Sequence, residues 1–231
     1  KNWITNGNSA SLYLVIAQTD HALGHKGINA FIVEKETEGV IVGKKEDKLG
    51  IRGSDTHSIM FTDVKVPKEN RIAENGFGFS FAMKTLSGGR IGIAAQALGI
   101  ASGAYELSLK YSKERKAFGK EISHHQAIAF KLADMATELE ASRLMLRDAA
   151  GKVDQNTTDK TKAAAMAKRF VTDKCFNIVN EALQIHGGYG YLKDYPLERN
   201  LRDVRVHQIL EGTNEIMNVI ISREILKENR W

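Results

Sequence analysis

The spacing of the apolar residues changes near residue 75, and this change limits the possible folds more than any other feature of the sequence. Before it, short runs rich in β-branched residues alternate with glycine-containing turns. After it, apolar residues recur every three or four positions, which is the period of an amphipathic helix. We therefore expect an α+β protein with a β domain over residues 1–74 and a helical domain over residues 75–231.

Four short apolar runs predict the strands of the first domain. They cover residues 12–17, 28–33, 40–42 and 58–61, and glycines lie in the turns between several of them. Short strands at this spacing are typical of a barrel or a sandwich. Only part of such a structure is present, so we expect a partial, barrel-like β domain.

Four longer amphipathic runs predict helices in the second domain. Their apolar residues span 91–101, 128–146, 164–182 and 216–226. Short connections separate the runs, and Thr213 is placed to cap the last one. Amphipathic helices joined in this way form a four-helix bundle.

The composition excludes several classes of protein. The single cysteine, Cys175, allows neither a disulfide framework nor a cysteine zinc cluster, and adjacent His124 and His125 lack the spacing of a helical metal pair, so we expect no metal site. No apolar stretch is long enough to cross a bilayer, which favours a soluble protein. The net charge of +5 favours a solvated, lysine-rich surface but leaves open attraction to an anionic partner such as a nucleotide or a CoA. Nucleic-acid binding has little support, because the basic tract at 110–120 with its two aromatic residues is isolated.

Two segments of the helical domain have more than one interpretation. Residues 184–191 contain three glycines where one would cap a helix, which leaves open whether a ligand approaches the backbone there. No strand precedes them, so they are not a Rossmann-type dinucleotide fingerprint. Residues 114–119 place Arg115 beside an aromatic residue and a glycine. That segment is either a polar break between helices or a site for a phosphate-bearing ligand.

Glu211 lies just before the last predicted helix, between Leu210 and Gly212. A capped turn explains the pattern, with Thr213 accepting from first-turn amides and Glu215 complementing the helix dipole. A carboxylate in such a place can also serve as a general base. The residues alone leave both interpretations open.

Eight motifs follow one another along the chain: WITNG at 3–7, KLGIR at 48–52, GRI at 89–91, ERKAFG at 114–119, HQ at 125–126, QIHGGYGY at 184–191, RD at 202–203 and EGT at 211–213. Together, and in this order, they resemble the acyl-CoA dehydrogenase family across nearly the whole chain. The resemblance implies an N-terminal helical domain, a middle β domain and a C-terminal four-helix bundle. The chain would then begin inside the middle domain, and we expect it alone to bind FAD more weakly than an intact relative.

The resemblance implies FAD as the cofactor. The residues that would lie beside the flavin ring are Trp3, Ile4, Thr5, Thr213, Asn214 and Glu215. Those that would hold the pyrophosphate and adenosine are Arg115, Phe118, His125 and Gln126. Those that would reach the FAD of a neighbouring subunit are Gln184, Ile185, His186, Gly187 and Gly188.

The resemblance also implies that Glu211 is the general base. Some members carry this glutamate just before the arginine that corresponds to Arg90, but here that position is Gly89. Glu211 would take the α-proton of an acyl-CoA while the β-carbon passes a hydride to the flavin, which gives a 2-enoyl-CoA. The residues that would bind the acyl-CoA are Ser87, Gly88, Gly89, Arg90 and Gly212, with Ser87 standing where many members have Asp.

The implied protein is a homotetramer, a dimer of dimers, that passes its electrons to an electron-transferring flavoprotein. Residues 88–90 and 186–195 look closest to short-chain and isobutyryl-type members, so we expect a short acyl chain, linear or branched. The implied compartment is the cytoplasm of a bacterium or the mitochondrial matrix of a eukaryote. The alternative is a non-catalytic fragment or paralogue that uses the bundle for oligomerisation.

Overall fold

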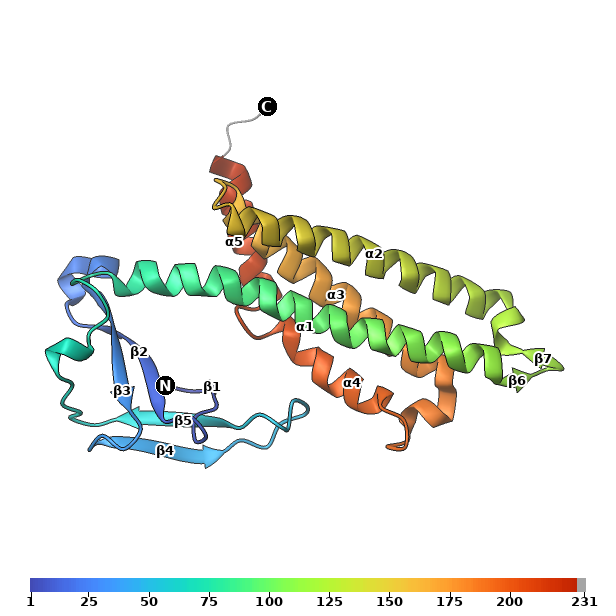
Figure 1. The fold of residues 1–231 in the computed structure, drawn as a ribbon, viewed down its shortest axis with the longest axis horizontal. Coiled ribbons are helices and arrows are strands. Elements are labelled where there is room, and N and C mark those ends of the chain that lie inside the picture. The colour runs from blue at the N-terminus through green and yellow to red at the C-terminus, as the bar shows by residue number, and fades with distance from the viewer. Residues whose placement is uncertain (228–231) are drawn as a thin grey trace. The chain divides into compact units, whose positions relative to one another are not determined.

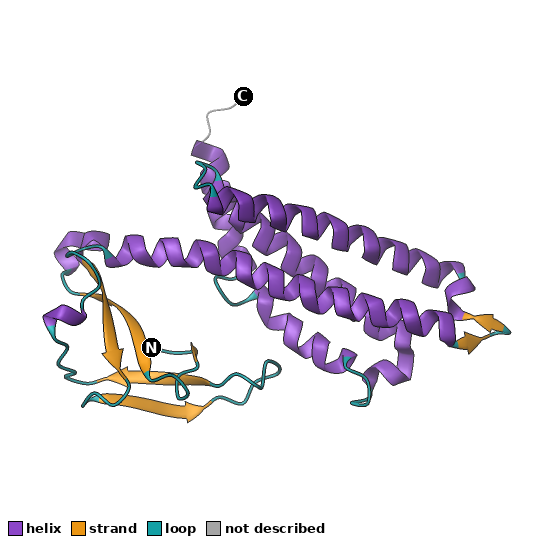
Figure 2. Ribbon diagram, viewed as in Figure 1, coloured by secondary structure: helices purple, strands orange, loops and turns teal. Residues whose placement is uncertain are grey.

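The computed structural model describes residues 1–227. They form two compact units, one spanning Lys1–Leu86 and a second that starts at Ser87. Strands dominate the first unit and helices the second, as Figures 1 and 2 show along the chain. The expected α+β class is therefore confirmed.

The first unit contains two small antiparallel sheets. One has the order β1-β5-β4 and the other pairs β2 with β3, so the described residues form no closed barrel. The four predicted strands are present as β2 to β5, whereas β1 is too short to show an alternating pattern. The strands are β1 Ile4–Thr5, β2 Leu12–Gln18, β3 Ile28–Glu34, β4 Val40–Lys45 and β5 Thr56–Phe61.

The β2–β3 pair has a continuous register from Leu12 opposite Glu34 to Gln18 opposite Ile28. A 3₁₀ helix, η1 (His21–Gly27), connects the two strands, and a second one, η2 (Lys68–Asn70), follows the sheets. The interior of this unit is small. Its buried apolar side chains are Tyr13, Ala30, Val33 and Ile59.

The first turns of the long helix α1 (Gly78–Glu114) pack against β3. A Cβ on Gly78 would lie closer to the backbone carbonyl carbon of Asn29 than two carbon atoms can approach. Only glycine therefore lets the start of α1 come this close to β3. The amide of Gly76 also donates to Asn29 Oδ1 at 2.8 Å. For this reason the compact units divide inside α1, after Leu86, whereas the boundary expected from the sequence lies just before the helix.

The four predicted helical runs lie in α1, α2, α3 and α5, and a short helix, α4, was not predicted. Leu197, Leu201 and Val204 lie on one face of α4, but two turns are too short for a clear period. The remaining elements are β6 Lys116–Ala117, β7 Lys120–Glu121, η3 Ile122–His124, α2 Gln126–Asp154, α3 Lys160–His186, η4 Gly187–Tyr191, α4 Leu197–Val204, η5 Arg205–Gln208 and α5 Asn214–Lys227.

Helix α3 is central to the second unit and packs on α2, α4 and α5. Alanines of α1, including Ala97, Ala101 and Ala104, join the same core, and such small side chains allow helices to approach closely. Ser108 of α1 reinforces the contact, because its hydroxyl donates to the carbonyl of Ala182 at 3.4 Å. Within residues 1–227 no helix is both long and apolar enough to cross a membrane.

Candidate active site

Glu211 and Gly212 form a strained turn between η5 and α5. Their φ angles are +54° and +92°, so two successive residues adopt the left-handed conformation. This conformation suits glycine, but it costs a residue with a Cβ about 1–2 kcal/mol. The surrounding contacts must therefore hold the Glu211 backbone in place.

The Glu211 carboxylate lies directly against Gly89 of α1. A Cβ at position 89 would be 2.5 Å from Glu211 Oε2 and 3.0 Å from Glu211 Cδ. The glycine therefore leaves the space that the carboxylate fills. Two of the predicted site residues, which lie far apart in the sequence, are thus brought together.

Arg90 places a positive charge in the same region. Its side chain is buried, and burial lowers the pKa of the guanidinium while the nearby Glu211 carboxylate raises it. The Nε atom makes no hydrogen bond within residues 1–227. Because an arginine stays protonated in proteins, Glu211 experiences a buried cation.

Lys168 of α3 holds the residue after Glu211, and the sequence analysis missed it. It is fully buried, and its Nζ donates to Gly212 O and to Asn214 Oδ1, both at 2.8 Å. Burial lowers its pKa to about 8. The available signal was its position, because Lys168 lies on the apolar stripe of α3 between Ala164 and Val171.

The segment before Glu211 is also anchored by polar side chains. His207 is fully buried, and its Nε2 lies 2.8 Å from Gln96 Oε1 of α1. Gln208 donates to Asp173 Oδ1 of α3 at 2.7 Å. The turn is therefore fixed to α1 and α3 on both sides of Glu211.

The start of α5 matches the predicted cap. Thr213 Oγ1 accepts from the amide of Ile216 at 3.4 Å, which is the usual bond of a helix N-cap. Asn214 is buried and donates to Thr172 and Asp173 of α3, so its side chain faces the protein interior. Glu215 is exposed.

A second group of predicted residues gathers where α1 and α3 end. Tyr111 stacks on His186 with ring centroids 4.2 Å apart, and the Arg115 guanidinium lies 5.6 Å from the centre of the Tyr189 ring. Gly187 has a φ of +56° and caps α3, as expected for a helix-ending glycine. The cleft is lined by Tyr111, Arg115, Ile122, Ile185, His186, Gly187, Gly188, Tyr189 and Leu192.

The β6–β7 hairpin brings two further predicted residues together beside Arg115. Phe118 is 97% exposed, and its ring meets that of His125 edge-on at 6.0 Å. His125 is held by Ala117, whose carbonyl lies 3.1 Å from Nε2. Gln126 begins α2 and is exposed. These side chains therefore form an accessible cationic and aromatic surface.

The structure does not bring these two groups together within one chain. Gly89 and Arg115 are separated by about 40 Å along α1, since a helix rises about 1.5 Å per residue. Trp3, Ile4 and Thr5 belong to the first unit, where Ile4 and Thr5 pair with β5 and Trp3 is largely exposed. Ser87 and Gly88 lie on α1 next to Gly89.

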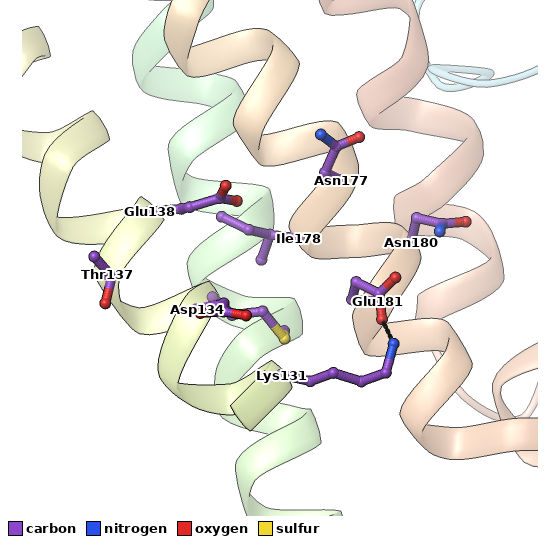
Figure 3. A pocket seen from close by; sticks show the side chains of 9 residues that line it. Lys131, Asp134, Thr137, Glu138, Asn177, Ile178, Asn180 and Glu181 are labelled. Carbon is purple, nitrogen blue, oxygen red and sulfur yellow. Dashed lines mark hydrogen bonds and ion pairs between the residues drawn. The ribbon is translucent and has the colours of Figure 1, made fainter. Parts of the chain in front are cut away.

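A polar groove between α2 and α3 contains none of the predicted site residues. Figure 3 shows Lys131 and Glu181 pointing toward one another across it as an ion pair. Lys174 and Glu138 form another pair, with Nζ and Oε1 2.6 Å apart. Acidic residues line the groove, yet no group of three His, Cys, Asp or Glu side chains in residues 1–227 is arranged to hold a metal ion.

Comparison with family models covers most of the chain. Residues 76–226 match the acyl-CoA dehydrogenase C-terminal domain, and residues 1–64 match the acyl-CoA dehydrogenase middle domain. The structure of butyryl-CoA dehydrogenase from Megasphaera elsdenii superposes with a TM-score of 0.93 at 49% identity, over 98% of this chain and 59% of that one.

Curated relatives agree with this match. The chain is 49% identical to the caffeyl-CoA reductase-Etf complex subunit CarC of Acetobacterium woodii, over 99% of its own length and 60% of the relative. It is 47% identical to the mitochondrial isobutyryl-CoA dehydrogenase of Dictyostelium discoideum, over 99% of its own length and 55% of that relative. It thus spans little more than half the length of these relatives. The predicted resemblance is confirmed: the chain belongs to the acyl-CoA dehydrogenase family.

Proposed function

We propose that this protein dehydrogenates short-chain acyl-CoA thioesters to 2-enoyl-CoA, with FAD as its cofactor and Glu211 as the general base. The observation that carries the proposal is the Glu211 carboxylate seated against Gly89. A turn that merely closed a helix would not need a strained glutamate, a matching glycine and a buried arginine at one place. This arrangement also argues against the non-catalytic alternative.

Glu211 supplies the base that the reaction requires. The α-carbon of a thioester is a weak acid, so proton removal needs a carboxylate held close to it. Glu211 Oε2 is aimed at the face of α1 where Gly89 has no side chain, and the neighbouring predicted substrate residues Ser87 and Gly88 lie on the same helix. We infer that the acyl chain passes this face with its α-proton toward Oε2.

The developing negative charge on the thioester oxygen has to be stabilised in the same site. The family resemblance implies two donors for this oxygen, the backbone amide of Glu211 and a ribityl hydroxyl of the flavin. The Arg90 guanidinium adds a positive potential within the protein interior, where charge acts more strongly than in water.

The cleft at the ends of α1 and α3 has the chemistry to hold the nucleotide part of FAD. Arg115 offers a guanidinium to phosphate, and Tyr111 and Tyr189 offer aromatic faces. A Cβ on Gly187 or Gly188 would meet nothing within 4 Å, so the backbone there is open to a ligand. When bound, FAD supplies the two-electron acceptor for the reaction.

The separation of about 40 Å between this cleft and Gly89 favours an oligomer. One extended FAD does not span both places, so the cleft is expected to serve the cofactor of a second copy of the chain. This supports association of at least two copies, which the proposed homotetramer, a dimer of dimers, would provide. Analytical ultracentrifugation that showed only monomer at micromolar concentration would contradict this part of the proposal.

Relatives guide the choice of substrate and electron acceptor. A short-chain specific acyl-CoA dehydrogenase of Megasphaera elsdenii is 49% identical, and the bovine isobutyryl-CoA dehydrogenase is 48% identical. The name of the Acetobacterium relative places that protein in a complex with Etf. We therefore propose a short linear or branched acyl chain and an electron-transferring flavoprotein as the acceptor.

Anaerobic rapid mixing tests the proposal. FAD-loaded protein is mixed with butyryl-CoA, isobutyryl-CoA, octanoyl-CoA or 3-phenylpropionyl-CoA, and the loss of the flavin's visible absorbance is followed. We expect the fastest loss with the two short thioesters. Bleaching by the aryl thioester alone would overturn the substrate class but keep the chemistry, a relevant outcome because a 3-(aryl)acrylate reductase is 49% identical. No bleaching with any of them would overturn the function.

A further inference from the structure

Lys168 is an unusual residue for the centre of a helical bundle. It is fully buried, and the α3 positions around it on the same stripe are the apolar residues Ala164, Ala167 and Val171. Taking an ammonium group out of water is unfavourable unless hydrogen bonds and opposite charges compensate. The side chain is therefore costly for the fold, and its contacts indicate what it does.

Both hydrogen bonds of the ammonium go to the turn that carries Glu211. Nζ donates to the carbonyl of Gly212, the next residue, and to Asn214 Oδ1, the first residue of α5. Asn214 in turn donates to Thr172 Oγ1 at 3.0 Å and to Asp173 Oδ1 at 2.7 Å. One face of α3 thus holds the backbone immediately after Glu211.

We propose that Lys168 is a positioning residue, which fixes Gly212 and Asn214 and thereby keeps the Glu211 carboxylate against Gly89. This inference rests on the proposed function of Glu211. The turn needs such support because the left-handed backbone of Glu211 is strained. A carboxylate displaced by about 1 Å is a poor base, since misplacement of that size costs about 10²-fold in rate.

The charged groups that act on Lys168 lie on its own helix, on α1, on α5 and on the turn before α5. Asp173 lies on its own helix, Glu215 on α5, Glu211 on the turn and Arg90 on α1. Two cations, Lys168 and Arg90, thus share the region with the base. A neutral side chain of similar length at position 168 would remove one cation and both anchoring bonds without adding bulk.

Lys168→Met is the informative variant, and Lys174→Met is its matched control. Lys174 lies on the same helix in a half-exposed ion pair with Glu138, away from the turn. In rapid mixing with butyryl-CoA, Lys168→Met should slow flavin reduction about 10- to 10²-fold with little change in the acyl-CoA dissociation constant. In hydrogen–deuterium exchange, peptides covering residues 205–213 should exchange faster. Lys174→Met should change neither.

A purely structural role predicts a different result. The folded, FAD-loaded fraction of Lys168→Met would then reduce its flavin at the normal rate, and this outcome would overturn the proposal. In a Glu211→Gln background, Lys168→Met should slow reduction little further, because it acts through that base. An equal additional loss there would also contradict the positioning role.

Two further outcomes are distinguishable. If Lys168→Met does not fold, Asn214→Ala removes one of the two acceptors, and it should show the same slow reduction and faster exchange on a smaller scale. Normal reduction in Asn214→Ala would then overturn the proposal. If no acyl-CoA reduces the flavin of the unaltered protein, the proposed function is overturned, and the positioning role, which depends on it, is overturned as well. If butyryl-CoA reduces the flavin of the unaltered protein and of Lys168→Met at the same rate, the positioning role alone is overturned.

Discussion

Two lysines on α3 show how differently one residue type can act on two faces of a helix. Lys168 is completely buried and bonds a backbone carbonyl and an asparagine at the candidate active site. Lys174 is half-exposed and pairs with Glu138, one of the residues that line the groove of Figure 3. The first bonds the turn that carries Glu211, whereas the second joins two helix surfaces.

The difference follows from solvent. Water screens the pair of Lys174 and Glu138, and such exposed pairs stabilise a protein by about 0–1 kcal/mol. No water screens Lys168, so each of its bonds restrains the turn strongly and each charge near it matters more. The buried face of α3 is therefore expected to control the reaction and the groove face to affect it little.

Among changes that keep Glu211 itself, the largest effect is expected from a substitution in α1 rather than in α3. Gly89→Ala places a Cβ 2.5 Å from Glu211 Oε2, so the carboxylate must move by about 1 Å. The rate of flavin reduction should fall about 10²-fold, equivalent to about 2.7 kcal/mol. Rapid mixing with butyryl-CoA measures it.

The matched control for this substitution is Gly99→Ala. Gly99 is also in α1, and a Cβ there would meet nothing within 4 Å. It should leave the rate unchanged and add slightly to helix stability. If Gly89→Ala reduced its flavin as fast as Gly99→Ala, the contact between the Glu211 carboxylate and Gly89 would not affect the rate of the reaction.

A somewhat smaller effect is expected in the pH dependence of stability. The pKa of Lys168 is about 8 in the fold, below its ordinary value of 10.5, so the fold penalises the charged form. Below pH 8 the lysine is charged in both the folded and the unfolded state, so folding bears the full cost of burying the charge. As the pH rises from 8 toward 10.5, the folded state loses this proton first and the free energy of unfolding increases. Relative to Lys168→Met, the unaltered protein should gain about 2 kcal/mol between about pH 7 and about pH 9.5.

Urea unfolding of both proteins at the two pH values checks this expectation. Groups other than Lys168 titrate in both proteins and cancel in the difference. An unchanged difference would mean that Lys168 titrates as an exposed lysine does. The buried contacts described for α3 would then be wrong.

The smallest effect is expected on the groove face. Lys174→Met removes one half-exposed ion pair, so the free energy of unfolding should fall by less than about 1 kcal/mol. Added salt should reduce the effect further, because it screens exposed charges. Thermal unfolding in low and high salt measures both. A loss of unfolding free energy as large as that caused by disrupting a buried charge would contradict the difference between the buried face and the groove face of α3.

The fold was largely predictable because periodicity carries over long segments. The runs that became α1, α2, α3 and α5 repeat their apolar spacing often enough to be recognised. Those that became β2 to β5 were recognised by β-rich apolar residues between glycine-containing turns. The elements missed are short. The strands β1, β6 and β7 have two residues each, and α4 has eight.

The site was predictable only in part. Glu211 and Gly89 came from motifs, and the structure shows why they belong together. Lys168, His207 and Gln96 carry no motif, and each acts through a contact between distant parts of the chain. A lone lysine on an apolar stripe is a signal, but it does not reveal which carbonyl the ammonium will reach.

Glu211→Gln tests the central claim most directly. It keeps the size of the side chain and the backbone amide but removes the base, with Glu138→Gln on the groove face as the control. In single-turnover mixing with butyryl-CoA, flavin reduction should fall about 10²- to 10⁴-fold while acyl-CoA binding persists. Glu138→Gln should behave normally. Near-normal bleaching in Glu211→Gln would contradict the assignment of Glu211 as the base.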